Sequence, residues 1–123
     1  MAYSEDVARR VRDHLGGHPD LREQKMFGGI AFMLAGNMCV GVLGDSLMAR
    51  VGPAQYGEAL TQPHARPMDF TGRAMRGFVY VDPEGFADDA DLETWLERCV
   101  RFAESLPPIE FGRIAAQSAK QVI

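Results

Sequence analysis

Near both ends of the chain, apolar residues recur every three or four positions, a spacing that predicts amphipathic helices. Ser4 can cap the first helix, and Gly16-Gly17 ends it. Asp88 or Asp89 can cap the last helix, which is expected from Asp91 to Leu106 before two prolines. The two apolar stripes are formed by Val7, Ala8, Val11 and Leu15 and by Leu92, Leu96, Cys99, Ala103 and Leu106.

Between these helices the pattern changes to short apolar runs separated by tight turns, which is typical of an antiparallel meander. The gaps of two or three residues cannot hold the crossover that parallel strands need. We expect strands at residues 21–27, 30–34, 38–43 and 46–51. Further elements expected are a helix at 54–60, a loop at 62–67, an extended segment over 67–70, a strand over 73–82 and a turn at 83–85.

Helices with a single apolar stripe need a second layer to cover that stripe. We therefore predict an α+β fold, a two-layer sandwich with an antiparallel sheet and helices on one face. The order is roughly α-β(3)-α-β(2)-α, with three or more strands in the first run. Residues 1–108 are expected to form the domain, and 109–123 a C-terminal tail with weak helical character, which could dock on the domain or on a partner, or fray.

Composition supports one ordinary globular domain, with 123 residues of which 46% are hydrophobic and 24% charged. No window resembles a membrane span, and the N-terminus lacks the features of a signal peptide. We therefore expect a cytoplasmic protein without a membrane anchor. Cys39 and Cys99 have no zinc-ligand spacing and are expected to be buried, reduced thiols.

The net charge of −4 conceals a basic group in the middle of the chain and an acidic last third. Such a group can bind an anion or a phosphate backbone, or can be solvated and paired with nearby carboxylates. Asp69 lies between Arg66 and Arg73 in the sequence and is expected to form an internal ion pair with them. Lys25, Arg50 and Arg76 could share a sheet face or rim. The basic group is Lys25, Arg50, Arg66, Arg73 and Arg76.

No set of residues predicts catalysis. His14, His18 and His64 have no nucleophile beside them, and no carboxylate pair suggests acid–base work. We expect no enzyme activity, no cofactor and no metal. Six methionines in the middle of the chain could fill gaps in the core or line an adaptable binding surface.

Several short strings follow one another in a specific order and spacing. They are Lys25-Met26-Phe27-Gly28-Gly29, Gly36-Asn37-Met38, residues 47–53, Arg66-Pro67-Met68-Asp69-Phe70 and residues 75–81. From about Ala2 to Pro108, this set resembles the N-terminal domain of the TfoX/Sxy family, bacterial regulators of natural competence. The resemblance implies an α+β fold and a positive regulator that acts with a cyclic-AMP receptor protein. Full-length members carry a second helical domain, so we expect a stand-alone N-terminal domain here.

The function that follows is a non-enzymatic regulatory or protein-interaction module, associated with transcription. Its contacts are expected at Lys25, Arg50 and Arg76, with Phe27 and Phe78 as apolar partners and Arg66 and Arg73 beside them. Direct nucleic-acid binding through the basic group is one alternative. A small-molecule site near Met26, Met48 and Met75 is another. The partner protein is unknown, and a homodimer through the sheet or the tail is a further hypothesis.

Overall fold

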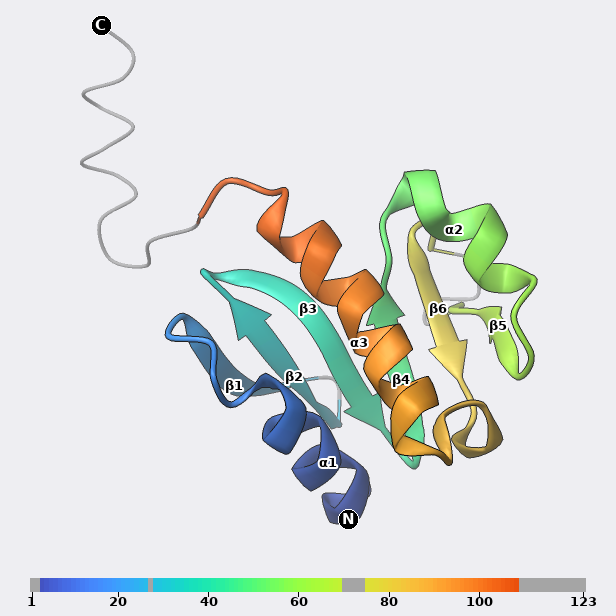
Figure 1. Ribbon diagram of the computed structural model, residues 1–123, viewed down its shortest axis with the longest axis horizontal. Coiled ribbons are helices and arrows are strands. Elements are labelled where there is room, and N and C mark those ends of the chain that lie inside the picture. The colour runs from blue at the N-terminus through green and yellow to red at the C-terminus, as the bar shows by residue number, and fades with distance from the viewer. Residues whose placement is uncertain (1–2, 27, 70–74, 109–123) are drawn as a thin grey trace, which may run out of the picture.

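The computed structural model describes residues 3–26, 28–69 and 75–108, and within them three helices lie against one sheet (Figure 1). The helices are α1 (Glu5–Leu15), α2 (Pro53–Leu60) and α3 (Asp89–Glu104), with a short 3-10 helix, η1 (Pro83–Phe86). The strands are β1 (Leu21–Met26), β2 (Gly29–Leu34), β3 (Asn37–Leu43), β4 (Ser46–Arg50), β5 (Ala65–Pro67) and β6 (Phe78–Val81). The expected order is confirmed, with four strands in the first run.

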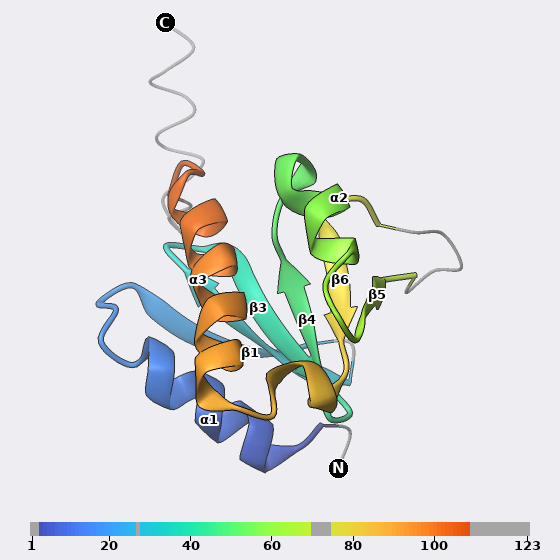
Figure 2. The same cartoon turned by 45° about the vertical axis from the view of Figure 1, so that its right-hand side comes forward.

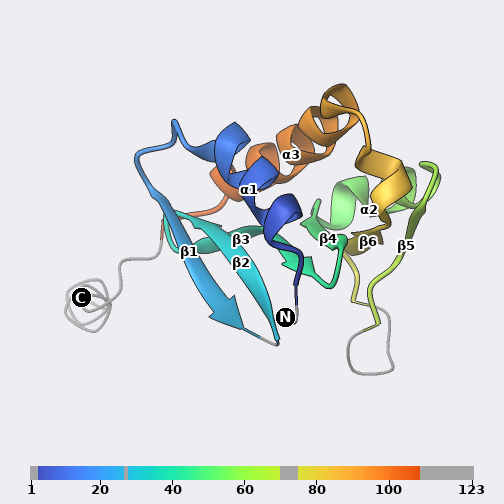
Figure 3. The same ribbon diagram turned by 90° about the horizontal axis from the view of Figure 1, so that it is seen from below.

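The six strands form one antiparallel sheet in the order β1-β2-β3-β4-β6-β5. The first four strands are a meander, as the short turns predict. β6 then lies between β4 and β5, so the chain reaches the sheet edge before it returns. Figure 2 shows α1 and α3 across the β1–β4 part of the sheet and α2 beside β5 and β6. Seen from below in Figure 3, the described helices all lie on one side of the sheet, which confirms the two-layer α+β sandwich.

The core lies between the helices and the sheet face that they cover. The stripes of α1 and α3 are buried there, as their spacing predicts, apart from Leu106, which lies beyond α3 and is half-buried. The strands contribute fully buried side chains to the same cluster: Phe32, Val40, Val42, Leu47, Val79 and Val81. At the start of α1, the Ser4 hydroxyl accepts a hydrogen bond from the Val7 amide, so the expected cap is present.

Two strands differ from the expectation. β5 covers Ala65–Pro67, within the predicted loop, instead of residues 67–70. β6 begins at Phe78 rather than at residue 73. The reason for the late start is Gly77, whose φ of +96° does not suit a strand. Residues 70–74, part of both expected segments, lie outside the described residues.

Three elements pack closely together at the end of β4, through contacts among Gly52, Gly77 and Phe102. The carbonyl of Gly77 accepts hydrogen bonds from the amides of Val51 (2.8 Å) and Gly52 (3.0 Å). Gly52 has a φ of +88°, and a Cβ built on it would lie 2.4 Å from Cδ1 of Phe102 on α3. This junction joins β4, the turn before β6, and α3, and it requires glycine at position 52.

Replacement of Gly52 by alanine is expected to destabilise the domain by about 3 kcal/mol, because a strained backbone and a steric overlap with Phe102 add together. The matched control is Gly57→Ala in α2, where a Cβ would meet nothing within 4 Å. That change should stabilise the domain by about 0.5–1 kcal/mol, because alanine favours a helix. Urea unfolding of both variants checks the pair. Equal stability of the Gly52→Ala and wild-type proteins would contradict the role of the junction.

None of the helices within the described residues has the length and the hydropathy needed to cross a bilayer.

Candidate functional site

The sheet face opposite the helices carries a second apolar cluster. Leu47 and Ala49 of β4 belong to the main core, so Met48 between them points to the other face. Tyr80 of β6 is paired with Met48 and lies on the same side. We call this cluster the methionine face: Met38, Leu43, Met48, Met68, Met75, Phe78 and Tyr80.

The methionine face has a filled centre and a half-buried border. A Cβ on Gly41 would lie 2.6 Å from Cε of Met48, so this side chain packs directly on the glycine backbone. Met68, from the chain beyond β5, is only 4% exposed, and its carbonyl accepts a 2.8 Å hydrogen bond from the Met75 amide. Around this centre, Met38, Leu43, Met75 and Phe78 remain half-buried. The face therefore offers apolar contacts to a partner without a hole in its middle.

Arg50 lies at the border between the methionine face and α3. Its guanidinium carbon is 5.5 Å from the ring centroid of Phe78 and 5.2 Å from that of Phe102. Its Nη1 donates a 3.3 Å hydrogen bond to the carbonyl of Met38. These contacts with two aromatic rings and a backbone carbonyl hold the charge at a fixed place. Arg50 therefore has a structural role in addition to any part in binding.

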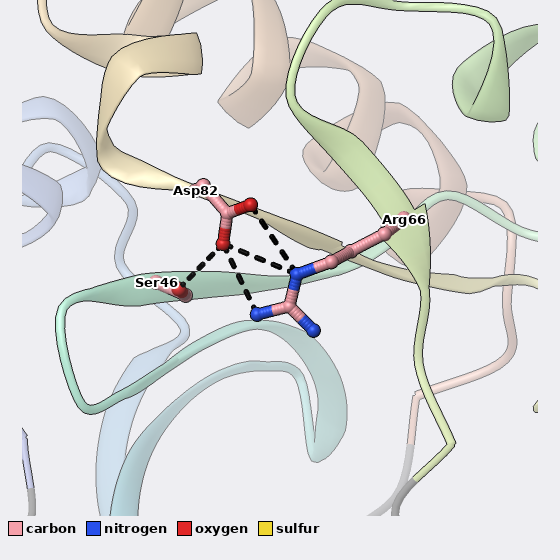
Figure 4. Close-up of polar contacts among 3 residues, drawn as sticks. All are labelled: Ser46, Arg66 and Asp82. Atoms are coloured by element: carbon pink, nitrogen blue, oxygen red, sulfur yellow. Dashed lines mark hydrogen bonds and ion pairs between the residues drawn. The ribbon is translucent and has the colours of Figure 1, made fainter.

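Arg66 lies on the same face, beside Tyr80, and is paired with Asp82 (Figure 4). Its Nη2 is 3.0 Å from Oδ1 of Asp82, and the Ser46 hydroxyl donates to the same oxygen at 3.2 Å. The hydrogen bond with Arg66 lowers the pKa of Asp82 and raises the pKa of Arg66. The expected pairing of Asp69 with Arg66 is wrong, because β6 brings Asp82 beside Arg66 while Asp69 remains exposed. The other expected partner of Asp69, Arg73, lies outside the described residues.

The predicted site residues are only partly brought together. Arg50, Arg66 and Phe78 lie on β4, β5 and β6, and Arg76 is exposed in the turn just before β6. Lys25 lies on β1, at the opposite edge of the sheet, and pairs with Ile30 of the main core, so it belongs to the helix side. Lys25 therefore does not share a face with the arginines. Phe27 and Arg73 lie outside the described residues.

The sequence did not single out Ser46 and Asp82, which hold Arg66 in place. Asp82 directly follows the strongest strand signal, but no local pattern indicates that its partner is sixteen positions earlier. The pairing depends on β5 and β6 being neighbours, and only the sheet order establishes that.

Cys39 and Cys99 are both buried and reduced, as expected. Burial raises the pKa of Cys39 to about 12 and raises that of Cys99 well above its ordinary value. A neutral thiol is a poor nucleophile, so neither residue is suited to covalent chemistry. Across residues 3–26, 28–69 and 75–108, no group of three or more histidine, cysteine or acidic side chains could hold a metal ion.

These observations define a small α+β sandwich with one covered sheet face and one apolar face bordered by arginines. The chain belongs to the TfoX N-terminal domain family, whose model matches residues 13–103, and this confirms the resemblance found in the sequence. The match extends from within α1 to the last turn of α3 and so includes the whole methionine face. Neither a curated protein nor a solved structure matches the chain significantly.

The Asp82–Arg66 pair should make a small, pH-dependent contribution to stability. The pKa of Asp82 is lowered on folding, so its contribution is full above the unfolded pKa near 3.8 and is lost as pH falls through the folded pKa. Both side chains are about a third or more exposed, so we expect Asp82→Asn to cost only about 0.5 kcal/mol at pH 7 and less at pH 3. Urea unfolding at both pH values measures this. The control, Asp69→Asn, should change little at either pH, and a larger effect there would support the discarded pairing.

The two thiols should not react with Ellman's reagent at pH 8 in the folded protein and should both react in denaturant. Because the pKa of Cys39 is raised on folding, its stabilising contribution is full below about 9.0 and is lost as pH rises towards about 12. Unfolding of the Cys39→Ala variant should show a shallower loss of stability over that range. Rapid labelling of a native thiol would contradict the buried, protonated assignment.

Proposed function

We propose that this domain is a non-enzymatic regulatory module of the bacterial cytoplasm that binds a protein partner through the methionine face. The observation that supports this proposal is that Met38, Met75 and Phe78 remain half-buried around the packed centre of the methionine face. Thioether side chains are flexible and polarisable, and such surfaces adapt to partner proteins. Membership of the TfoX N-terminal domain family supports a role like that of the competence regulators.

The chemistry of the face favours a partner segment that combines apolar side chains with carboxylates. Arg76 is exposed, and no carboxylate of the described residues pairs with it. Arg50 presents a fixed positive charge next to Phe78. Arg66 contributes less, because Asp82 already neutralises it. An apolar contact at Met75 and Phe78 with acidic groups towards Arg50 and Arg76 would satisfy all of these side chains.

The sharpest test places a photo-cross-linking phenylalanine analogue at position 78. The matched control carries the same analogue at Arg9, which is exposed on α1, on the other side of the sheet. We expect one discrete adduct in cells from position 78 and not from position 9. The reversal Arg76→Glu should weaken binding of the purified partner about tenfold, because it replaces an attraction by a repulsion. Arg9→Glu should leave the affinity unchanged.

Other outcomes distinguish the alternatives. Adducts that are the same from both positions, or absent from both, would reject the methionine face as an interface. An adduct between two copies of this chain would identify a homodimer as the assembly. If the domain bound nucleic acid, it would retard the migration of the nucleic acid in a gel at low salt. This retardation would fall steeply as the salt concentration rises. The net charge of −4 and the neutralised Arg66 favour the protein partner over that alternative.

A further inference from the structure

A cavity of about 430 Å³ lies on the helix side of the sheet, where α2 begins and α3 ends. Its size falls within the range of small-molecule sites in proteins. The described residues that line it come from the end of β4, the first turn of α2 and the second half of α3: Val51, Pro53, Ala54, Gln55, Arg98, Arg101 and Phe102. None of the methionine face residues is among them.

The inner wall of the cavity is apolar and held in place. Val51 is fully buried, and the Phe102 ring contacts both the backbone of Gly52 and the guanidinium of Arg50. These contacts fix the ring, so the wall does not need to rearrange before an apolar group binds. Pro53 and Ala54 add a rigid, small-residue border at the start of α2.

The outer wall is positively charged. The guanidinium of Arg98 lies 5.4 Å from the Trp95 ring centroid, and its Nη1 is 3.4 Å from Oε1 of Glu58. The side chain of Arg98 is only 19% exposed, so its remaining N–H donors have a defined position. Arg101 is exposed and pairs with no carboxylate of the described residues. None of the described lining residues is acidic. Glu58 partly neutralises Arg98 from outside the lining, so Arg101 is the cation that faces the cavity without a competing anion among the described residues.

We infer that this cavity binds a small organic carboxylate whose apolar body, a ring or a short acyl chain, lies against Val51 and Phe102. The carboxylate would accept hydrogen bonds from Arg98 and Arg101, since a guanidinium matches a carboxylate with two parallel N–H donors. Gln55 can donate a further bond from its amide. A bare inorganic anion would leave the apolar wall unused, and a neutral apolar molecule would leave Arg101 without an anionic partner.

A second cavity on the same side of the sheet provides an internal comparison. It lies between α1 and α3 and is lined by Glu93, Glu97 and Glu104 together with histidines and apolar residues. These three carboxylates repel an anionic ligand, so a carboxylate should distinguish the two cavities. Arg101 borders both of them, and therefore its loss weakens the α2–α3 site without making the other one attractive to anions.

The test is a titration of the ¹⁵N-labelled full chain with octanoate, followed by amide chemical shifts. We expect saturable shifts at Val51, Ala54 and Gln55. Octanol and inorganic phosphate, each tested alone, should bind at least about tenfold more weakly, because each lacks one half of the recognition. Arg101→Gln should weaken octanoate binding about tenfold. Arg9→Gln, a change at an exposed arginine of α1 that does not line the cavity, should leave octanoate binding unchanged.

Four results would overturn the inference. They are the absence of saturable shifts, shifts confined to the α1–α3 cavity, equal affinity of the Arg101→Gln variant, and phosphate binding as tightly as octanoate. The spectrum of each variant shows whether it is folded. Should Arg101→Gln fail to fold, Ala54→Trp, which fills the cavity from its rim, replaces it and should abolish the shifts. Cross-linking from position 78 remains informative whichever result is found, because it probes the other face of the sheet.

Discussion

The junction at the end of β4 is the constraint on which both surfaces of the domain depend. There the carbonyl of Gly77 binds two successive amides, and the Phe102 ring occupies the space that a side chain on Gly52 would need. These contacts fix where β4 stops, where β6 starts and how closely α3 approaches the sheet. Arg50, two residues before Gly52 at the end of β4, adds its contacts with Phe78 and Phe102 and so links the two sides of the sheet. A change at the junction would therefore disturb more than local packing.

The two sides of this junction have different chemistry. On one side, the methionine face is broad, half-buried and adaptable, which suits the side chains of a protein partner. On the other, the α2–α3 cavity is small, with a fixed aromatic wall and two arginines, which suits a compact ligand. Phe102 lines the cavity directly, and the guanidinium of Arg50 lies 5.2 Å from its ring centroid. One short segment of chain thus shapes both surfaces while keeping them on opposite sides of the sheet.

Periodicity predicted most of the fold, because helix stripes and strand runs are local properties of the chain. The cap at Ser4, the meander up to Arg50 and the stripe of α3 were found this way. The sequence failed where the outcome depends on contacts between distant segments. It could not place β6 between β4 and β5, so it missed the pairing of Arg66 with Asp82. It also grouped Lys25 with the arginines, because the face of Lys25 depends on its pairing with Ile30 and on which face the helices cover. The cavity was missed for the same reason, since the residues of α2 and of α3 that line it are more than forty positions apart in the chain.

The arginines distinguish one binding hypothesis from another better than the net charge does. Arg66 is held by Asp82, so it gains little from a partner's carboxylate. Arg50 is held between two aromatic rings, and its removal would disturb the fold together with any binding. Arg76 and Arg101 are exposed, belong to different surfaces and have no carboxylate partner among the described residues. Because neither of these two side chains forms an ion pair within the described part of the fold, a change at either one tests one surface and leaves the other intact.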